Sequence, residues 1–250
     1  MRLITIRSDG SFIKLVYICA MLAKRYPRKK LVIFGASSFA EIANTYFAQS
    51  DFQVVAHLVD TEYAPEDKFE IGGAPVYDIN STLGLGAISK ASHFYVAVTY
   101  TQLNQLRYTK YQLLKNMGKS PASYISPLAI VDPSVKIGEH TFIFEANVIQ
   151  YGARIGKNCI LWSGNHVGHH SIVGDNVFVS SHVVVSGHVE IGKNSFLGVN
   201  ATVYNNIKIG QDNWLSPGTI VQRNSEDNVL FKVKGTEPYP LKTREYFKLD

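Results

Sequence analysis

Histidine is concentrated in one short part of this 250-residue chain, because five of its eight histidines lie between positions 166 and 188. Three of them fall in the stretch GNHVGHHSIVG at 164–174, and the other two are His182 and His188. A histidine side chain titrates near neutral pH and can act as a general base. The same imidazole nitrogens are common ligands of zinc. The spacing therefore indicates either a catalytic base with its neighbours or a metal site.

A period of six residues runs through the part of the chain that carries these histidines. Every sixth position is aliphatic, sixteen times in succession: Val131, Ile137, Ile143, Ile149, Ile155, Leu161, Val167, Val173, Val179, Val185, Ile191, Leu197, Val203, Ile209, Leu215 and Val221. Helices repeat every 3.6 residues and strands every two, so neither explains this pattern. A chain that turns a corner every six residues, with three sides to each coil, does explain it. Coils stacked about 4.8 Å apart would bury one aliphatic column, which predicts a parallel β-helix over residues 126–235.

Residues 18 positions apart lie above one another in such a coil. Glycine recurs at this interval, at Gly138, Gly156, Gly174, Gly192 and Gly210. The same register predicts that His169 lies against Gly187 and His170 against His188. Acyl transfer from a thioester needs a base for the attacking group and a fixed donor for the oxyanion. His169 could be that base, and Gly187 has a backbone N–H that no side chain screens.

The segment before the repeat alternates strands and helices. KKLVIFG is a short buried strand, 36–50 has helical spacing, 53–60 and 93–99 are further strands, and 102–118 is a helix closed by glycine. This order predicts a small parallel sheet of Rossmann type over residues 29–125. Its ligand would lie beyond the carboxyl ends of the strands, where the candidates are Gly35, Ala36, Ser37, Ser38, Phe39, Asp60, Thr99 and Tyr100. The turn GASSFA lacks two glycines of the dinucleotide fingerprint, which favours a single phosphate group, or a tight turn with no ligand, over a whole dinucleotide.

Composition and charge exclude several classes of function. The chain is 46% hydrophobic and 18% charged, as in soluble globular proteins. Its net charge of +5 is spread out apart from AKRYPRKK at 23–30, so we expect no nucleic-acid partner. Cys19 and Cys159 have no CxxC spacing and indicate reduced thiols in the cytoplasm.

The two ends of the chain fall outside both predicted domains. The apolar run FIKLVYICAMLA at 12–23 is too short to span a bilayer and contains Lys14. Residues 1–28 are therefore interpreted as a helical or poorly ordered extension, with a membrane anchor as the alternative, and no stable membrane insertion is expected. Residues 236–250 form a C-terminal tail.

The repeat, an aliphatic residue followed by glycine and four further positions, resembles the hexapeptide-repeat acyltransferases, whose left-handed β-helix trimerises. With a Rossmann-like domain in front of it, the chain is similar to the bacterial sugar O- and N-acetyltransferases of the NeuD and PglD type. The resemblance covers about residues 29–235. It implies a cytoplasmic homotrimer that transfers acetyl from acetyl-CoA to a nucleotide-linked amino-deoxy sugar of the 4-amino-4,6-dideoxyhexose type, for surface glycan synthesis.

The resemblance also implies roles for individual residues of the β-helix. His169 is then the general base, and Gly187 contacts the thioester. The relatives carry an acidic residue directly after this histidine, and here His170 stands in its place, so Asp175 or Glu190 are other candidates to orient His169.

Further implied contacts lie in the groove for acetyl-CoA and in the first domain. Acetyl-CoA would follow a groove between two subunits toward Gly218, with Lys232 and Lys234 on its phosphates or, alternatively, on a solvated tail. In the first domain the glycine turn would face the phosphates and sugar, Asp60 the ribose or base, and Ala97, Thr99 and Tyr100 the opposite wall.

Three alternatives remain open at this point. A sugar or sialic acid O-acetyltransferase would use the same base and thioester. A zinc enzyme similar to the γ-type carbonic anhydrases would use His166, His169, His170 and His188, but it would not need the first domain, so no metal is expected. A trimerising stalk without activity would bind no acetyl-CoA. His166, His182 and His188 are also compatible with ordinary wall positions.

Overall fold

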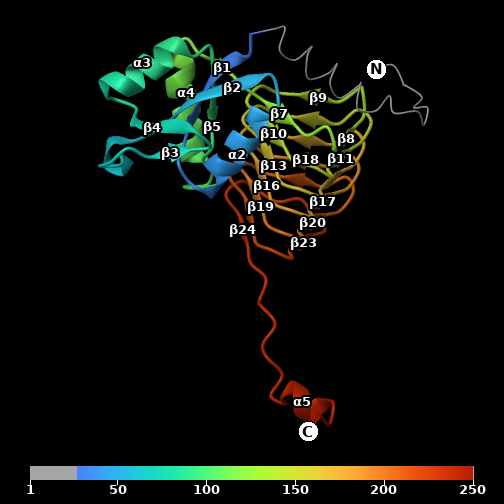
Figure 1. Cartoon of the computed structure of the whole chain (residues 1–250). Helices are drawn as coiled ribbons and strands as arrows, with labels where there is room; N and C mark the ends of the chain where they lie inside the picture. The colour runs from blue at the N-terminus through green and yellow to red at the C-terminus, as the bar shows by residue number, and fades with distance from the viewer. Residues whose placement is uncertain (1–26, 250) are drawn as a thin grey trace, which may run out of the picture. The chain divides into compact units, whose positions relative to one another are not determined.

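The computed structural model describes residues 27–249, which divide into two compact units (Figure 1). The first unit comprises residues 27–97 and Gly118–Ser120, and the second comprises Val98–Met117 and residues 121–249. The segment 98–117, which the strand and helix pattern groups with the first domain, therefore makes its contacts with the β-helix. The predicted extension at 1–28 lies almost wholly outside the described residues. Within residues 27–249, no helix has the length and apolar composition needed to cross a bilayer.

The first unit is built on a mostly parallel sheet in the order β3-β4-β2-β1-β5-β6. Its strands are β1 (Lys29–Phe34), β2 (Phe52–Val59), β3 (Glu70–Ile71), β4 (Ala74–Asp78), β5 (His93–Val96) and β6 (Ser120–Pro121). Its helices are α2 (Ser38–Ala48), α3 (Thr82–Lys90) and the 3₁₀ turn η1 (Thr61–Tyr63). The three predicted strands and the first helix are present, although β5 ends three residues early.

The elements β3, β4 and α3 were not predicted from the sequence. The two strands are short, and the glycines in α3 weaken its helical pattern. Gly84 is nevertheless required, because a Cβ there would lie 2.1 Å from the Asp78 carbonyl oxygen. Close packing of the helix on the sheet therefore outweighs the low helix propensity of glycine.

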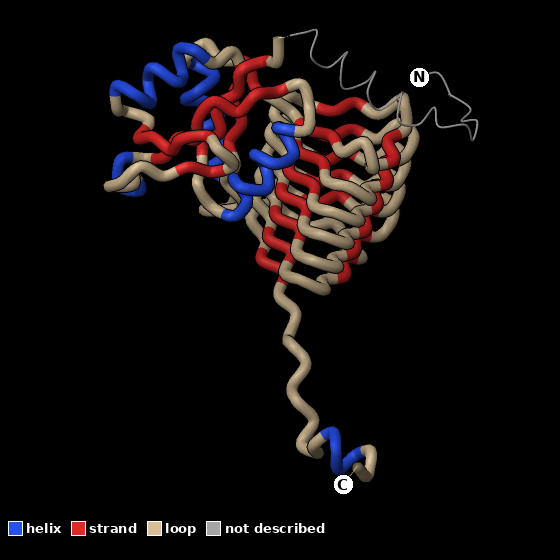
Figure 2. The backbone as a smooth tube through the Cα atoms, viewed as in Figure 1, coloured by secondary structure: helices blue, strands red, loops and turns tan. Residues whose placement is uncertain are grey.

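The second unit is a three-sided parallel β-helix whose two-residue strands recur on successive coils (Figure 2). One sheet contains β7 (Tyr124–Ile125), β10 (Phe142–Ile143), β13 (Ile160–Leu161), β16 (Phe178–Val179), β19 (Phe196–Leu197), β22 (Trp214–Leu215) and β24 (Leu230–Phe231). The next contains β8 (Ile130–Val131), β11 (Val148–Ile149), β14 (His166–Val167), β17 (Val184–Val185), β20 (Thr202–Val203) and β23 (Ile220–Val221). The third contains β9 (Lys136–Ile137), β12 (Arg154–Ile155), β15 (Ile172–Val173), β18 (Glu190–Ile191) and β21 (Lys208–Ile209).

The core of the β-helix is the aliphatic column predicted from the period of six. Fourteen of the sixteen residues of the series lie in one buried hydrophobic cluster, together with Cys159, and the partly buried Val131 and Ile137 pack against it. The recurring glycines have a packing reason as well, because a Cβ on any of the five would lie 2.4–2.8 Å from the backbone of the next coil. The prediction of stacked six-residue sides is confirmed.

The outward residues give the three sheets different surfaces. The sheet from β7 to β24 has an aromatic face, which residues 98–117 contact through Tyr100. The Tyr100 ring packs on the rings of Phe178, Phe196 and Trp214, with centroids 4.8–5.9 Å apart. The sheet from β8 to β23 has an apolar face, formed by Ile130, Val148, His166, Val184, Thr202 and Ile220. The sheet from β9 to β21 has a mostly charged face.

A ladder of buried and half-buried polar side chains runs along one corner of the β-helix. It consists of His140, Asn158, Asn176, Asn194 and Asp212, all with positive φ, and each side chain is hydrogen-bonded to the next at 2.7–2.9 Å. Asparagine tolerates this left-handed backbone, and its amide can both donate and accept. The members of the ladder therefore satisfy one another's hydrogen-bonding groups.

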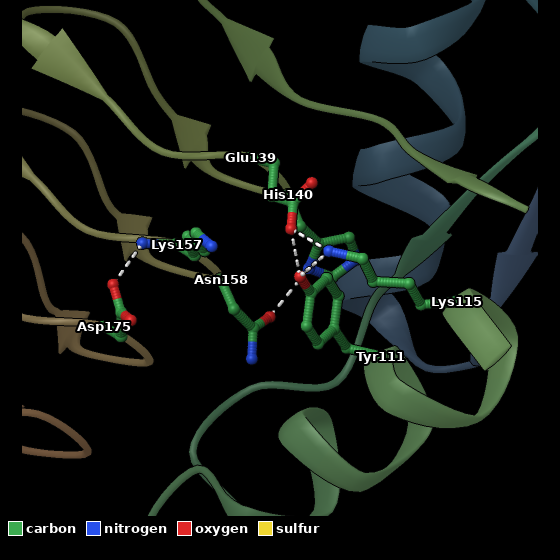
Figure 3. A network of polar contacts seen from close by, with 7 residues as sticks. All are labelled: Tyr111, Lys115, Glu139, His140, Lys157, Asn158 and Asp175. Atoms are coloured by element: carbon green, nitrogen blue, oxygen red, sulfur yellow. Dashed lines mark hydrogen bonds and ion pairs between the residues drawn. The ribbon is translucent and has the colours of Figure 1, made fainter.

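The helix α4 (Gln105–Asn116) fastens residues 98–117 to this ladder. The fully buried Arg107 donates from Nη2 to the carbonyl oxygens of Asn158 and Asn176, at 3.2 and 3.3 Å. Figure 3 shows Tyr111 and Lys115 of the same helix reaching the Glu139 carboxylate beside His140. The Lys115 ammonium and the Tyr111 hydroxyl hold the pKa of Glu139 below its usual value.

His140 should make the β-helix sensitive to acid. Its side chain is 1% exposed, and burial lowers its pKa to about 3 from the ordinary value of 6.5. The folded chain then binds fewer protons than the unfolded chain between these values, so its stability falls as pH drops from 6.5 toward 3, by about 1.4 kcal/mol per pH unit. His140→Asn, which repeats the residue found at the next three positions of the ladder, should remove this part of the slope. Urea unfolding at pH 4.5, 5.5 and 7 measures it, and an unchanged slope would contradict the assignment.

Candidate active site

Three histidine rings meet at the corner between the apolar and charged faces. His169 Nδ1 lies 3.2 Å from His170 Nδ1, and the two rings are nearly perpendicular. The His170 and His188 rings are stacked, with centroids 5.0 Å apart and planes 5° from parallel. All three side chains are exposed. The predicted stacking of His170 on His188 is confirmed.

His169 also lies against Gly187, as the 18-residue register predicts. A Cβ on Gly187 would be 2.7 Å from His169 Nε2, so the ring in this position lies directly over the bare glycine. The backbone N–H of His169 donates to Gln150 Oε1 at 3.0 Å. The ring nitrogen that faces Gly187 is therefore Nε2, while Nδ1 faces His170.

The backbone N–H of Gly187 is not open in the way that the sequence suggests. It donates to Oδ1 of Asn205, one coil further on, at 3.0 Å. The Asn205 side chain is exposed, so it can turn away at little cost in packing. The sequence register identifies the bare glycine, but it does not identify Asn205 as the acceptor of the hydrogen bond from the glycine N–H.

The two carboxylates considered as partners of His169 make other contacts. Asp175 accepts from the Lys157 backbone N–H at 2.8 Å, and Glu190 pairs with Lys208 at 3.6 Å. In the part of the chain that the structure describes, neither is seen bonded to His169. The neighbour of the His169 Nδ1 is the Nδ1 atom of His170.

A cavity of about 580 Å³ lies beside His169. Ile130 and Val148 of the apolar face line it, together with Tyr151. An apolar wall with a histidine at its edge suits a ligand that presents both an extended apolar part and a reacting group. His166 is half-buried in β14, and His182 lies at a different corner from His169.

The other predicted residues of the acetyl-CoA groove lie further along the unit. Gly218 has φ +74° at the turn between β22 and β23, on a different corner from His169. Lys232 and Lys234 are exposed in the segment after β24. Trp162, on the aromatic side of the β-helix, is half-buried and stacks on Phe144 with centroids 4.6 Å apart.

The predicted turn of the first unit lies at the end of β1, where the sheet order changes direction between β1 and β5. Gly35 has φ +127°, and a Cβ there would lie 2.8 Å from the Ala97 carbonyl oxygen. Ala36, Ser37 and Ser38 are exposed, and no hydrogen bond from the Ser37 side chain caps α2 among the described residues. This leaves the N-terminus of α2 accessible to an anion.

Two of the predicted ligand-binding residues near this turn have buried side chains. Phe39 and Ala97 are buried in the core of the first unit, because α2 and β5 pack together there. Asp60, which follows β2, is half-buried. Thr99 and Tyr100 belong to the second unit, so the residues predicted as one opposite wall are divided between the two units.

His57 supports the turn and was not singled out from the sequence. It is fully buried in β2, with Nδ1 3.0 Å from the Gly35 carbonyl oxygen and Nε2 3.2 Å from Asn44 Oδ1. Burial lowers the pKa of His57, which keeps the ring neutral. Nothing in the run QVVAHLVD distinguishes it from other strand residues.

The chain is similar to a known domain family and to several solved structures. Residues 120–229 match a family model described as the GMPPB C-terminal domain. A search of curated protein sequences gives no match. Among solved structures, the chain is similar to a variant of perosamine N-acetyltransferase from Caulobacter crescentus in complex with CoA and GDP-perosamine. The identity is 26%, the match covers 83% of this chain and 97% of that one, and the TM-score is 0.73.

Two further structures share the fold. The acetyltransferase domain of PglB from Neisseria gonorrhoeae has 21% identity and a TM-score of 0.69, over 81% of this chain and 96% of that one. WeeI from Acinetobacter baumannii has 19% identity and a TM-score of 0.62, over 81% and 95%. An α/β unit followed by a left-handed parallel β-helix is the architecture of this group. The predicted fold class and the resemblance to hexapeptide-repeat sugar acetyltransferases are thus confirmed.

Proposed function

We propose that this chain is an acetyl-CoA-dependent N-acetyltransferase that acts on a nucleotide-linked amino-deoxy sugar of the 4-amino-4,6-dideoxyhexose type, for surface glycan synthesis. The observation that carries the proposal is the placement of His169, with Nε2 against the bare backbone of Gly187 and Nδ1 beside His170. The likeness to an N-acetyltransferase solved with CoA and GDP-perosamine supports the choice of an amine acceptor.

His169 is the proposed general base. If its Nδ1–H donates to His170 Nδ1, the lone pair is on Nε2, the nitrogen beside Gly187. Nε2 takes a proton from the sugar amine as the amine nitrogen attacks the thioester carbonyl carbon. The tetrahedral intermediate then collapses, the C–S bond breaks, and the leaving thiolate receives a proton from the imidazolium. The products are the amide and CoA with a free thiol.

The Gly187 N–H is the proposed donor to the thioester oxygen. Asn205 Oδ1 is its acceptor at 3.0 Å, so the thioester oxygen must replace Asn205 in this hydrogen bond. The Gly187 N–H then donates to the thioester oxygen instead of to Asn205, so the number of hydrogen bonds is unchanged. The backbone of the coil holds this donor in place. Acetyl-CoA would extend from here toward Gly218, with Lys232 and Lys234 as candidates for its phosphates.

The first unit is proposed to hold the nucleotide. The accessible N-terminus of α2, at Ala36, Ser37 and Ser38, suits a phosphate group. Asp60 is placed at the end of β2, where an acidic residue can accept a hydrogen bond from ribose. These roles are carried over from the resemblance together with the turn at Gly35.

The apolar face is proposed to be covered in a homotrimer. Ile130, Val184 and Ile220 are 68%, 38% and 62% exposed on it, which is unusual for one continuous sheet surface. A three-sided prism can associate around a threefold axis through such a face. Sedimentation equilibrium of the full chain should give about three times the chain mass of 27.8 kDa. A monomer would contradict this part of the proposal.

A cytoplasmic location is proposed with this function. Cys159 is a free, buried thiol, and burial raises its pKa to about 12. A protein kept in a reducing compartment is expected to carry its cysteines in this form.

A thioester-release assay tests the proposed function. Acetyl-CoA is supplied with a panel of UDP-, dTDP- and GDP-linked amino sugars and, separately, with free sialic acid. Release of CoA with a nucleotide-linked amino sugar supports the proposal, whereas release with sialic acid alone supports the O-acetyltransferase alternative. Failure of acetyl-CoA to bind in calorimetry would favour the stalk without activity.

His170 is proposed to position His169, and two substitutions separate this role from a structural one. His170 has φ +59°, and the same corner carries Gly152 and Asn206, so glycine and asparagine both suit the backbone. The Oδ1 atom of an asparagine can accept a hydrogen bond from the His169 Nδ1–H, whereas glycine has no side chain to accept it. The turnover of His170→Gly should therefore be about tenfold lower than that of His170→Asn, at similar KM for acetyl-CoA. Equal turnover of the two variants would show that His170 does not orient the base.

A further inference from the structure

We propose that His169, His170 and His188 also form a binding site for a transition-metal dication of the zinc class, and that the bound ion switches off the general base. The binding itself does not depend on the proposed function, whereas the inhibition rests on it. The three side chains each offer a ring nitrogen, and these nitrogens lie within 4.8 Å of one another.

The distances suit one shared ion. Tetrahedral zinc with bonds of 2.0–2.1 Å to nitrogen places two nitrogen ligands about 3.4 Å apart. His169 Nδ1 and His170 Nδ1 are already 3.2 Å apart. One ring nitrogen from each of the three residues lies within 4.8 Å of the others, and the exposed His188 ring must turn out of its stack on His170 to direct its lone pair at the same ion.

The backbone holds two of these ligands in place before any ion binds. His170 and His188 have φ of +59° and +56° at equivalent turns of neighbouring coils. Backbone hydrogen bonds join the coils here, including one from His188 N to the His169 carbonyl oxygen at 3.0 Å. Prior placement lowers the entropy lost when an ion is bound.

The donor set selects the kind of ion. Imidazole nitrogens suit Zn²⁺, Cu²⁺, Ni²⁺ and Co²⁺, whereas Mg²⁺ and Ca²⁺ require oxygen ligands. Three histidines leave a fourth position for water. The rings are exposed, so ions can enter from solvent.

Metal binding would remove the base by changing the tautomer of His169. A neutral imidazole that binds metal through one nitrogen carries its proton on the other. With Nδ1 on the ion, Nε2 becomes an N–H donor and can no longer take a proton from the sugar amine. The hydrogen bond between His169 and His170 is lost in the same step.

The test uses the full chain without an affinity tag, after treatment with a chelator. Titration with Zn²⁺ in calorimetry should show one ion per chain, Co²⁺ should give the intense visible bands of four-coordinate cobalt, and Mg²⁺ should not bind. His188→Asn should weaken Zn²⁺ binding by about tenfold or more, because it removes one ligand. Asparagine suits the positive φ of this turn, as Asn206 shows one coil further on. The matched control is His182→Asn, at a similar turn outside the cluster, which should bind Zn²⁺ like the unaltered chain.

The inhibitory step is measured separately by thioester release. Zn²⁺ should slow acetyl transfer by the unaltered chain, a chelator should restore it, and His188→Asn should escape this inhibition. Equal Zn²⁺ affinity of the unaltered chain and His188→Asn would overturn the site. Tight binding with unchanged turnover would overturn the switch. Absence of turnover with every sugar bears on the proposed function alone, since the calorimetry needs no sugar.

Discussion

Replacing His169 by alanine should lower the rate of acetyl transfer by about 10² or more, while acetyl-CoA binds nearly as before. The substitution removes the nitrogen that faces Gly187 and leaves the backbone of the coil intact, because His169 is not at a positive φ. Without a base, the sugar amine must lose its proton to water, and the attack slows. Binding of acetyl-CoA depends mainly on the groove, so its affinity should change little.

Two measurements separate these effects. Turnover is followed by thioester release, and acetyl-CoA affinity by calorimetry on the same preparation. His182→Asn serves as the control, since it changes a histidine at another corner and should keep the turnover of the unaltered chain. Turnover of His169→Ala close to that of the unaltered chain would overturn the assignment of the base.

Replacing Arg107 by methionine should lower the free energy of unfolding by about 3 kcal/mol or more. Arg107 is fully buried, and its Nη1 donates to the Thr99 carbonyl oxygen at 2.5 Å and to Asn104 Oδ1 at 3.1 Å. Its Nη2 donates to carbonyl oxygens of Asn158 and Asn176. Methionine fills part of the space but donates nothing, so several buried acceptors lose a charged donor at once.

Urea unfolding at pH 7 measures this loss. Arg154→Met is the matched control, because Arg154 is exposed on the charged face and its replacement should change stability by less than about 0.5 kcal/mol. A loss below about 1 kcal/mol for Arg107→Met would show that other contacts hold residues 98–117 to the β-helix. Because Arg107 also bonds the Thr99 carbonyl, the same variant should loosen the segment that carries Tyr100.

Most of the β-helix could be predicted because its geometry repeats along the chain. An inward position every six residues must be aliphatic, and a close approach every 18 residues must be glycine, so both requirements are visible in the sequence. The same arithmetic places His169 against Gly187. The first unit was predicted less completely, since β3, β4 and α3 are short or rich in glycine and leave weak patterns.

The side-chain partners at the site could not be predicted in this way. The sequence did not show that the His170 ring lies against Nδ1 of His169. It also did not show that the Gly187 N–H donates a hydrogen bond to Asn205. Nor did it show that Phe39 would be buried rather than facing a ligand. These contacts depend on ring rotation and on packing between elements, which no spacing records.

The amino-acid sequence by itself determined the period, and with it the three-sided coil, its aliphatic column and the coil on which each histidine lies. Only the tertiary structure decided which nitrogen of His169 faces Gly187, that Arg107 joins residues 98–117 to the asparagine ladder, and that three imidazoles meet closely enough to share an ion. The physical reason is that a repeat constrains the backbone through local steric rules. Side-chain direction and hydrogen-bond partners are set by neighbours that are distant in the sequence.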